Sequence, residues 1–109
     1  MTIESTTLLN SASSKQLVAV LTAITDENTM RNFLRDVMTE KEIIEIAARL
    51  EAARMLQAGE TYNAIATTTK LSSRTIARIS EWLQNGQGGY ASAIEQINTH
   101  HDHTPPARA

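Results

Sequence analysis

Apolar residues recur along this chain at the three- and four-residue intervals of α-helices. The first such stretch runs from Lys15 to Thr25 and places Leu17, Leu21 and Ile24 on one face. A second follows Asp26, a residue suited to cap a helix N-terminus. Its apolar positions are Met30, Phe33, Leu34, Val37 and Met38. No useful stretch shows the strict alternation of a half-buried strand, so the pattern predicts an all-α chain of five or six helices.

A long third helix has clear start and stop signals. It starts at the sequence TEKE, a capping box in which the Thr39 hydroxyl accepts from the Glu42 amide while the Glu42 side chain reaches back. Gly59 stands where a helix end commonly needs a left-handed residue. We expect the following positions of this helix to face inward: Ile43, Ile46, Ala47, Leu50, Ala53 and Leu56.

Two short apolar phrases, YNAIATTT and SRTIARI, follow the long helix. Neither can form a stable helix alone, because isolated helices of about 12 residues are already marginal in water. Their small and apolar positions nevertheless have the spacing of a helix-turn-helix: Ile65, Ala66, Leu71, Ile76 and Ile79. Thr61 is a suitable cap for the first helix, and Ser72 or Ser73 for the second. We predict a helix-turn-helix over about residues 61–83, in which Lys70 takes a turn position commonly held by glycine.

The second helix of this pair has an outer face suited to DNA. At about 100° per residue, Arg74, Ala77, Arg78 and Glu81 fall opposite the apolar side chains. Two arginines one turn apart can reach guanine edges or phosphates in a major groove, and a small alanine lets the helix approach the bases. The predicted DNA-binding residues are Ser72, Ser73, Arg74, Thr75, Ala77 and Arg78, with phosphate contacts from Arg54, Thr61, Asn63 and Lys70. The alternative is a helical hairpin that only packs and leaves both arginines in solvent.

Composition narrows the class of protein. The 109-residue chain has a net charge of −2, but residues 49–85 hold five basic against three acidic residues. It contains no cysteine, which excludes disulfides and thiolate metal sites. No apolar run approaches the roughly 20 residues that span a bilayer, and the N-terminus lacks the basic start of a signal or transit peptide. We therefore expect a cytoplasmic protein.

The chain is expected to form one helical domain between two tails. Residues 1–14 are rich in Ser and Thr and lack periodicity, which predicts a disordered N-terminal arm. Residues 15–98 form the predicted domain, whose last short helix holds Tyr90, Ala91, Ile94 and Ile97. Residues 99–109 are predicted to be a disordered tail.

Other groups of polar residues indicate neither a metal site nor an enzyme. The HHDH sequence at residues 100–103 contains metal-ligating residue types, but it lies in the predicted tail without a buried partner. The sequence GQGG follows a predicted helix rather than a strand, so it lacks the context of a nucleotide-binding loop. Glu42, Glu45 and Glu51 lie on a helix face with no nucleophile or histidine nearby in sequence. We predict no catalytic residue, no metal and no cofactor.

The stretch RLEAARMLQAGETYNAI, the pentapeptide TIARI and the ending NGQGGY together resemble the Trp repressor superfamily, and within it the YerC/YecD branch. With the preceding helices, the resemblance covers about residues 15–98. It implies an all-helical homodimer with interlocking N-terminal helices, and transcriptional regulation by a helix from Ser73 to Leu83 presented to operator DNA. A two-fold dimer implies a near-palindromic operator with half-sites about one DNA turn apart. The implied shared core comprises Leu17, Val20, Leu21, Ile24, Phe33 and Leu34.

The resemblance also implies a pocket for L-tryptophan between two arginines, beside a threonine at the start of the long helix. The corresponding positions here hold Thr39, Arg49 and Arg78. The small residue that follows the second arginine in the repressor is replaced by the bulky Ile79, which we expect to fill the pocket. A different small-molecule effector, or none, is therefore expected rather than L-tryptophan. An ion pair with Glu45 or Glu42 is the alternative role for Arg49.

The main hypothesis is a homodimeric, sequence-specific DNA-binding transcriptional regulator, and specifically a repressor. Its partners would be double-stranded DNA and a second copy of the chain. The alternative is a helical protein–protein interaction module that docks an acidic partner without sequence-specific DNA binding. A third hypothesis is a sensor that needs a small-molecule effector before it binds DNA.

Overall fold

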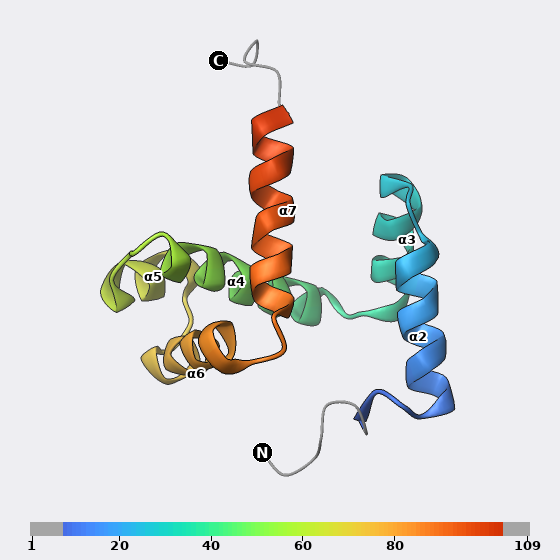
Figure 1. Cartoon of the computed structure of the whole chain (residues 1–109), viewed down its shortest axis with the longest axis horizontal. Coiled ribbons are helices and arrows are strands. Elements are labelled where there is room, and N and C mark those ends of the chain that lie inside the picture. Colours follow the sequence, from blue (N-terminus) through green and yellow to red (C-terminus); the bar gives the residue numbers. More distant parts are fainter. Residues whose placement is uncertain (1–7, 104–109) are drawn as a thin grey trace. The chain divides into compact units, whose positions relative to one another are not determined.

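The computed structural model describes residues 8–103, with side chains described for residues 8–99. This part of the chain contains six helices and no strand, which confirms the predicted all-α class (Figure 1). The helices are α2 (Ala12–Ala23), α3 (Glu27–Val37), α4 (Glu40–Gln57), α5 (Tyr62–Thr69), α6 (Ser73–Asn85) and α7 (Gly89–His103). Within the described range, no helix has both the length and the apolar character needed to cross a membrane.

The chain divides into two compact units, residues 1–40 and residues 41–109. Helix α2 begins at Ala12 and α7 reaches His103. Residues 1–7 of the predicted arm and residues 104–109 of the predicted tail lie outside the described residues.

The first unit contains α2 and α3, and neither helix has a buried residue. Asp26 caps α3 as predicted, because its carboxylate accepts a hydrogen bond of 2.9 Å from the Thr29 amide. That hydrogen bond stabilises the ionised carboxylate and lowers the pKa of Asp26. The apolar side chains of α2 stay in contact with solvent within this chain: Leu17 is 46% exposed and Leu21 is 37% exposed. Within its described residues, the first unit therefore has apolar surface but no buried core of its own.

Helix α4 ends at the predicted place through a Schellman motif. The Glu60 amide donates to the Met55 carbonyl, and the Gly59 amide donates to the Leu56 carbonyl, both at 3.0 Å. Gly59 has φ of +90°, a left-handed conformation that glycine adopts without a Cβ penalty. Glu60 and Thr61 then lead into α5.

The core lies in the second unit and joins four helices. Its buried members are Ala52, Ala53, Met55, Ile65, Ile76, Ile79 and Ile94. Four of these have no exposed surface, and two of the four, Ala52 and Ala53, have small side chains that allow close approach to α4. Partly buried side chains of Leu56, Ala66, Leu71, Leu83 and Tyr90 surround the cluster.

Within this chain, the first half of α4 is less buried than the predicted inward face, and Ile43 is only half-buried there. Ile46 is 56% exposed and Ala47 is also exposed within this chain. The buried residues of α4 are instead Ala52, Ala53 and Met55. The cluster formed with α5, α6 and α7 thus includes only the C-terminal half of α4.

Shortening a buried isoleucine should destabilise the second unit. Ile65 has no exposed surface, so Ile65→Ala removes buried methyl groups and leaves a cavity. We expect a loss of about 2–5 kcal/mol in the free energy of unfolding, measured by chemical denaturation at one fixed protein concentration. The exposed Thr67→Ala on the same helix is the control and should change stability by no more than about 0.5 kcal/mol. Equal stability of the two variants would contradict the assigned core.

Candidate nucleic-acid interface

Helices α5 and α6, joined by a short turn, occupy the segment for which the sequence predicted a helix-turn-helix. Ile65 and Ile76 are fully buried, and Ile79 is 2% exposed. Ala66 and Leu71 are partly buried against the same cluster. All five positions identified from the spacing therefore contribute to the contact between the two helices and the core. This contact gives α6 a defined inner face and leaves the opposite face outward.

Both helices of the pair begin with a side-chain cap. The Thr61 hydroxyl accepts a hydrogen bond of 3.1 Å from the Ala64 amide at the start of α5. At the start of α6, the Ser72 hydroxyl accepts from the Thr75 amide at 3.1 Å. Ser72, and not Ser73, is thus the cap of the second helix. Because Ser72 ends the turn, this cap fixes where α6 begins.

The turn places Lys70 in a left-handed backbone conformation that glycine commonly adopts. Lys70 has φ of 66° and ψ of 14°, and it is the C-cap of α5. Its amide donates to the Ala66 carbonyl at 2.8 Å. The Thr69 hydroxyl donates to the Ile65 carbonyl at 2.8 Å and accepts from the Leu71 amide at 3.3 Å. The turn is therefore held by hydrogen bonds on both sides of Lys70.

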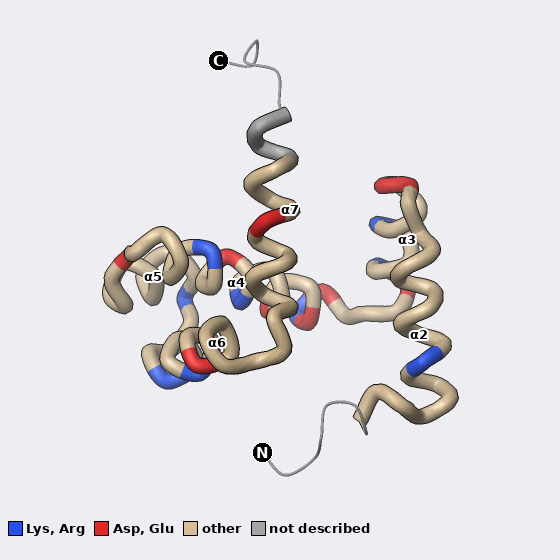
Figure 2. The backbone as a smooth tube through the Cα atoms, in the orientation of Figure 1, with Lys and Arg blue, Asp and Glu red and all other residues tan. Residues whose placement is uncertain are grey.

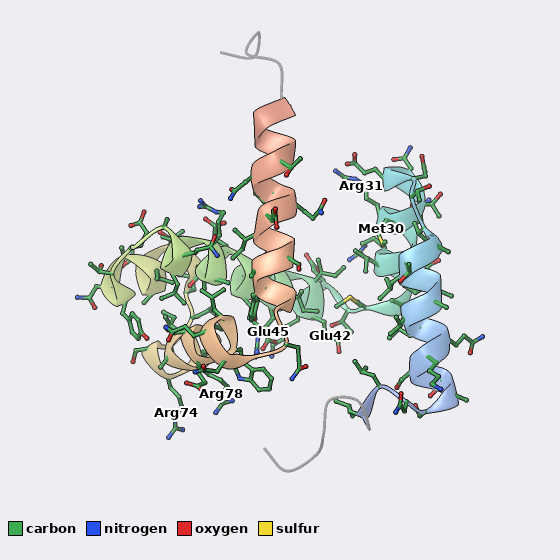
Figure 3. All side chains as sticks on the ribbon, in the orientation of Figure 1. Met30, Arg31, Glu42, Glu45, Arg74 and Arg78 are labelled. Atoms are coloured by element: carbon green, nitrogen blue, oxygen red, sulfur yellow. The ribbon has the colours of Figure 1, made fainter. Side chains whose placement is uncertain are left out.

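The outer face of α6 carries exposed positive charge. Arg74 and Arg78 extend from the helix away from α4, α5 and α7 (Figure 3). Ala77 and Ser73 are also exposed, while Thr75 is half-buried. No acidic residue occurs from Thr61 to Ser80, and Figure 2 shows basic residues near the start of α6 with an acidic residue further along. The outward surface of the first turns of α6 is therefore cationic.

The arginines of the described residues differ in whether they form ion pairs. Among the described residues, Arg31, Arg49 and Arg54 each form an ion pair with a glutamate on their own helix. No such pair is formed by Arg74 or Arg78 in that part of the chain. Their guanidinium groups keep their donors for a ligand.

The candidate phosphate contacts differ in their local environment. Lys70, Thr61 and Asn63 are exposed around the helix pair. Arg54 instead donates two hydrogen bonds to Glu51, Nη2 to Oε2 at 2.6 Å and Nε to Oε1 at 3.0 Å. This pair lowers the pKa of Glu51 and raises the pKa of Arg54, in each case chiefly through the hydrogen bond. Arg54 is thus engaged within α4.

Arg49, one residue of the implied effector pocket, borders a cleft in the second unit. An open, mainly apolar cleft of about 540 Å³ contains Arg49, but neither Arg78 nor Ile79 lines it. Its lining residues are Ile46, Arg49, Leu50, Trp82, Gln87, Gly89, Tyr90 and Ala93. Ile79 lies in the core instead, and Arg78 points outward (Figure 3). Thr39 belongs to the first unit.

Two side chains that line this cleft, Arg49 and Trp82, bear on the sequence interpretation of the effector pocket. Arg49 donates to Glu45 at 2.9 Å, the ion pair that the sequence offered as its alternative role. Trp82 is a lining residue that the sequence interpretation missed, and it is 43% exposed. The available signal was its spacing, because Trp82 follows Arg78 by one helical turn on α6.

No cluster of three or more His, Asp or Glu side chains that could hold a metal occurs among the described residues. The side chains of the HHDH sequence at residues 100–103 lie outside that set. The surface that the structure does define is the cationic face of α6.

Comparisons with a family model and with solved structures both find Trp repressor-like proteins. The family model described as Trp repressor protein matches residues 12–98. The uncharacterized protein YerC of Bacillus subtilis (strain 168) is 37% identical over 82 residues, which are 75% of this chain and 79% of YerC. The crystal structure of a TrpR-like protein from Eubacterium eligens ATCC 27750 superposes with a TM-score of 0.78 at 32% identity, covering 84% of this chain and 94% of that one. A candidate Trp repressor from Staphylococcus aureus gives 0.79 at 26% identity, with 88% and 96% covered.

Removing the cap of α6 should weaken the helix pair. Ser72→Ala deletes the acceptor for the Thr75 amide, so we expect a loss of about 1 kcal/mol in the free energy of unfolding. Ser72→Asp restores an acceptor and should recover most of that stability. Chemical denaturation followed by circular dichroism measures both variants. A Ser72→Ala protein as stable as the wild type would contradict the capping role.

Proposed function

Because this chain belongs to the Trp repressor protein family, we propose that it is a DNA-binding transcriptional regulator that acts as a repressor. In this proposal a homodimer places α6 of each copy in the major groove of a near-palindromic operator. The observation that carries the proposal is a pair of exposed arginines on α6 that form no ion pair within the described residues. They lie in a helix pair whose segment 61–80 contains no carboxylate. The cationic surface of the first turns of α6 matches the phosphate backbone electrostatically.

We assign sequence reading to the outer face of α6. Arg74 and Arg78 are one turn apart, and a guanidinium can donate two hydrogen bonds to the O6 and N7 atoms of a guanine. Ala77 lies between them and leaves room for the helix to approach the bases. The hydroxyls of Ser72, Ser73 and Thr75 are assigned to the N-terminal end of α6, where a phosphate would also meet backbone amides. Thr61 and Asn63 at the start of α5 are assigned to flanking phosphates.

The homodimer is supported by the apolar surface of the first unit. After Lys15, α2 contains no charged residue, and the following side chains are at least 36% exposed: Leu17, Val18, Val20 and Leu21. Contiguous apolar surface of this kind marks association sites. A second copy supplies the same surface, and a two-fold axis repeats α6 on the other side. The two recognition helices can then meet half-sites about one turn of DNA apart.

We propose that L-tryptophan is not needed for operator binding. Arg49 is paired with Glu45, Arg78 points outward, and Ile79 occupies the core. A tryptophan carboxylate would therefore find only one of the two expected arginines at the cleft, already paired with a glutamate.

Selection of bound duplexes from a random DNA pool tests the function. The full chain, without added amino acids, should enrich a near-palindromic sequence over random duplex. Repeating the selection with L-tryptophan should return the same sequence at similar enrichment. If no sequence is enriched under either condition, the DNA-binding proposal fails and a protein-interaction module becomes the better account.

Removing one outward arginine should weaken operator binding. Arg74→Ala should cost about 1–3 kcal/mol of binding free energy and relax the preference at one base position, because the bidentate contact is lost. Titration of the selected operator by fluorescence anisotropy measures this change. The control is Arg35→Ala, which removes an exposed positive charge from α3, outside the helix-turn-helix. Unchanged operator affinity of a folded Arg74→Ala protein would remove Arg74 from the interface.

Placing a charge in the apolar face of α2 should disrupt the dimer. Leu17→Glu would bury an unpaired carboxylate at the proposed subunit contact, which is strongly unfavourable. Sedimentation velocity over a concentration series should show a lower apparent mass than for the wild type. Lys15→Glu, on the same helix but at a polar position, should sediment like the wild type. If Leu17→Glu sediments like the wild type at every concentration, α2 is not the dimer contact.

A further inference from the structure

Lys70 adopts a left-handed backbone conformation that would cost less free energy if the residue were glycine. It is the only non-glycine residue with positive φ among those the structure describes. In the left-handed region the Cβ of an L-residue crowds the backbone, whereas glycine has no such atom. The conformation itself is fixed by the turn, since the Lys70 amide donates to Ala66 and the Thr69 hydroxyl bridges Ile65 and Leu71. The fold therefore needs this backbone shape but not this residue type.

The side chain of Lys70 contributes no interaction to the fold that would explain its presence. Lys70 is exposed, and its ammonium forms neither an ion pair nor a hydrogen bond within the described part of the chain. It is not a member of the apolar cluster or of the residues packed against it. A strained backbone conformation at an exposed residue whose side chain adds nothing to the fold is the kind of outlier that accompanies function.

The position of Lys70 places its charge beside the proposed reading helix. It precedes the α6 cap Ser72 by two residues, and it shares with Arg74 and Arg78 a segment that contains no carboxylate. A lysine ammonium is a flexible point charge, which suits a phosphate but cannot make the planar two-donor contact that identifies a base.

We propose that Lys70 is a phosphate anchor whose charge is kept at the expense of a strained turn. This inference rests on the proposed DNA-binding function and assigns different DNA contacts to Lys70 and to the arginines of α6. Lys70 holds a backbone phosphate at the edge of the groove and contributes equally to every sequence, whereas the arginines of α6 read the bases. At this one position, lysine increases DNA affinity but lowers the stability of the fold, whereas glycine would do the reverse.

Three substitutions separate charge from strain. Lys70→Gly removes both, Lys70→Asn removes the charge and leaves a residue that tolerates the left-handed region, and Lys70→Arg keeps the charge and the strain. Lys41→Ala, an exposed lysine at the start of α4, is the matched control. Each protein is melted without DNA and titrated with the selected operator and with a random duplex at several salt concentrations.

We expect Lys70→Gly to raise the melting temperature by about 2–6 °C. The same variant should bind both the operator and the random duplex about three- to tenfold more weakly, and the slope of log K against log salt should fall by about one. Lys70→Asn should lose affinity to a similar extent. Lys70→Arg and Lys41→Ala should bind like the wild type.

Two results would overturn the assignment. The first is a Lys70→Gly protein that keeps the affinity and salt slope of the wild type on both duplexes. The second is a Lys70→Arg protein that binds as weakly as Lys70→Gly, because the charge would then not be the determinant. Both results leave the proposed function intact, since they require a wild type that binds DNA. A wild type that binds neither duplex refutes the proposed function itself, and the phosphate anchor with it.

Discussion

The packing of α5 and α6 against the C-terminal half of α4 is the contact on which the rest of the second unit depends. Alone, helices of 8 and 13 residues are too short to be stable in water. Ile65, Ile76 and Ile79 bury them in one cluster with Ala52 and Ala53. The two alanines matter because their small side chains allow the isoleucines to approach the α4 backbone closely. Burial thus supplies the stability that helix propensity alone does not.

This cluster also decides what α6 presents to solvent. Once Ile76 and Ile79 face the core, the helical period turns Arg74, Ala77 and Arg78 outward. The cap at Ser72 and the left-handed turn at Lys70 set the start of the helix, and so the place of each arginine along it. Core packing, capping and the cationic face are therefore parts of one arrangement. A defect in the core would be expected to disturb the DNA-binding surface without touching it.

The two units distribute their apolar residues differently. The second unit buries its isoleucines within one chain, whereas the first leaves the apolar side chains of α2 exposed. A short chain has limited surface to bury, and sharing a core between two copies is one way to gain more. In the proposed dimer, the unit without its own core makes the subunit contact and the unit with a core carries the recognition helix. The stability of the proposed dimer would then depend on protein concentration, and only the dimer would hold the two α6 helices at a fixed spacing.

Local signals in the sequence determined the helices, their caps and the end of α4. Thr61, Asp26 and Gly59 act where the sequence predicted, because caps and left-handed turns depend on near neighbours along the chain. The five helix-turn-helix positions were also predictable from spacing. Only the tertiary structure decided which half of α4 is buried and that Arg49 borders a cleft with Trp82 while Arg78 points outward. The reason is physical: periodicity gives each helix its faces, but the neighbour that covers a face comes from residues distant in sequence.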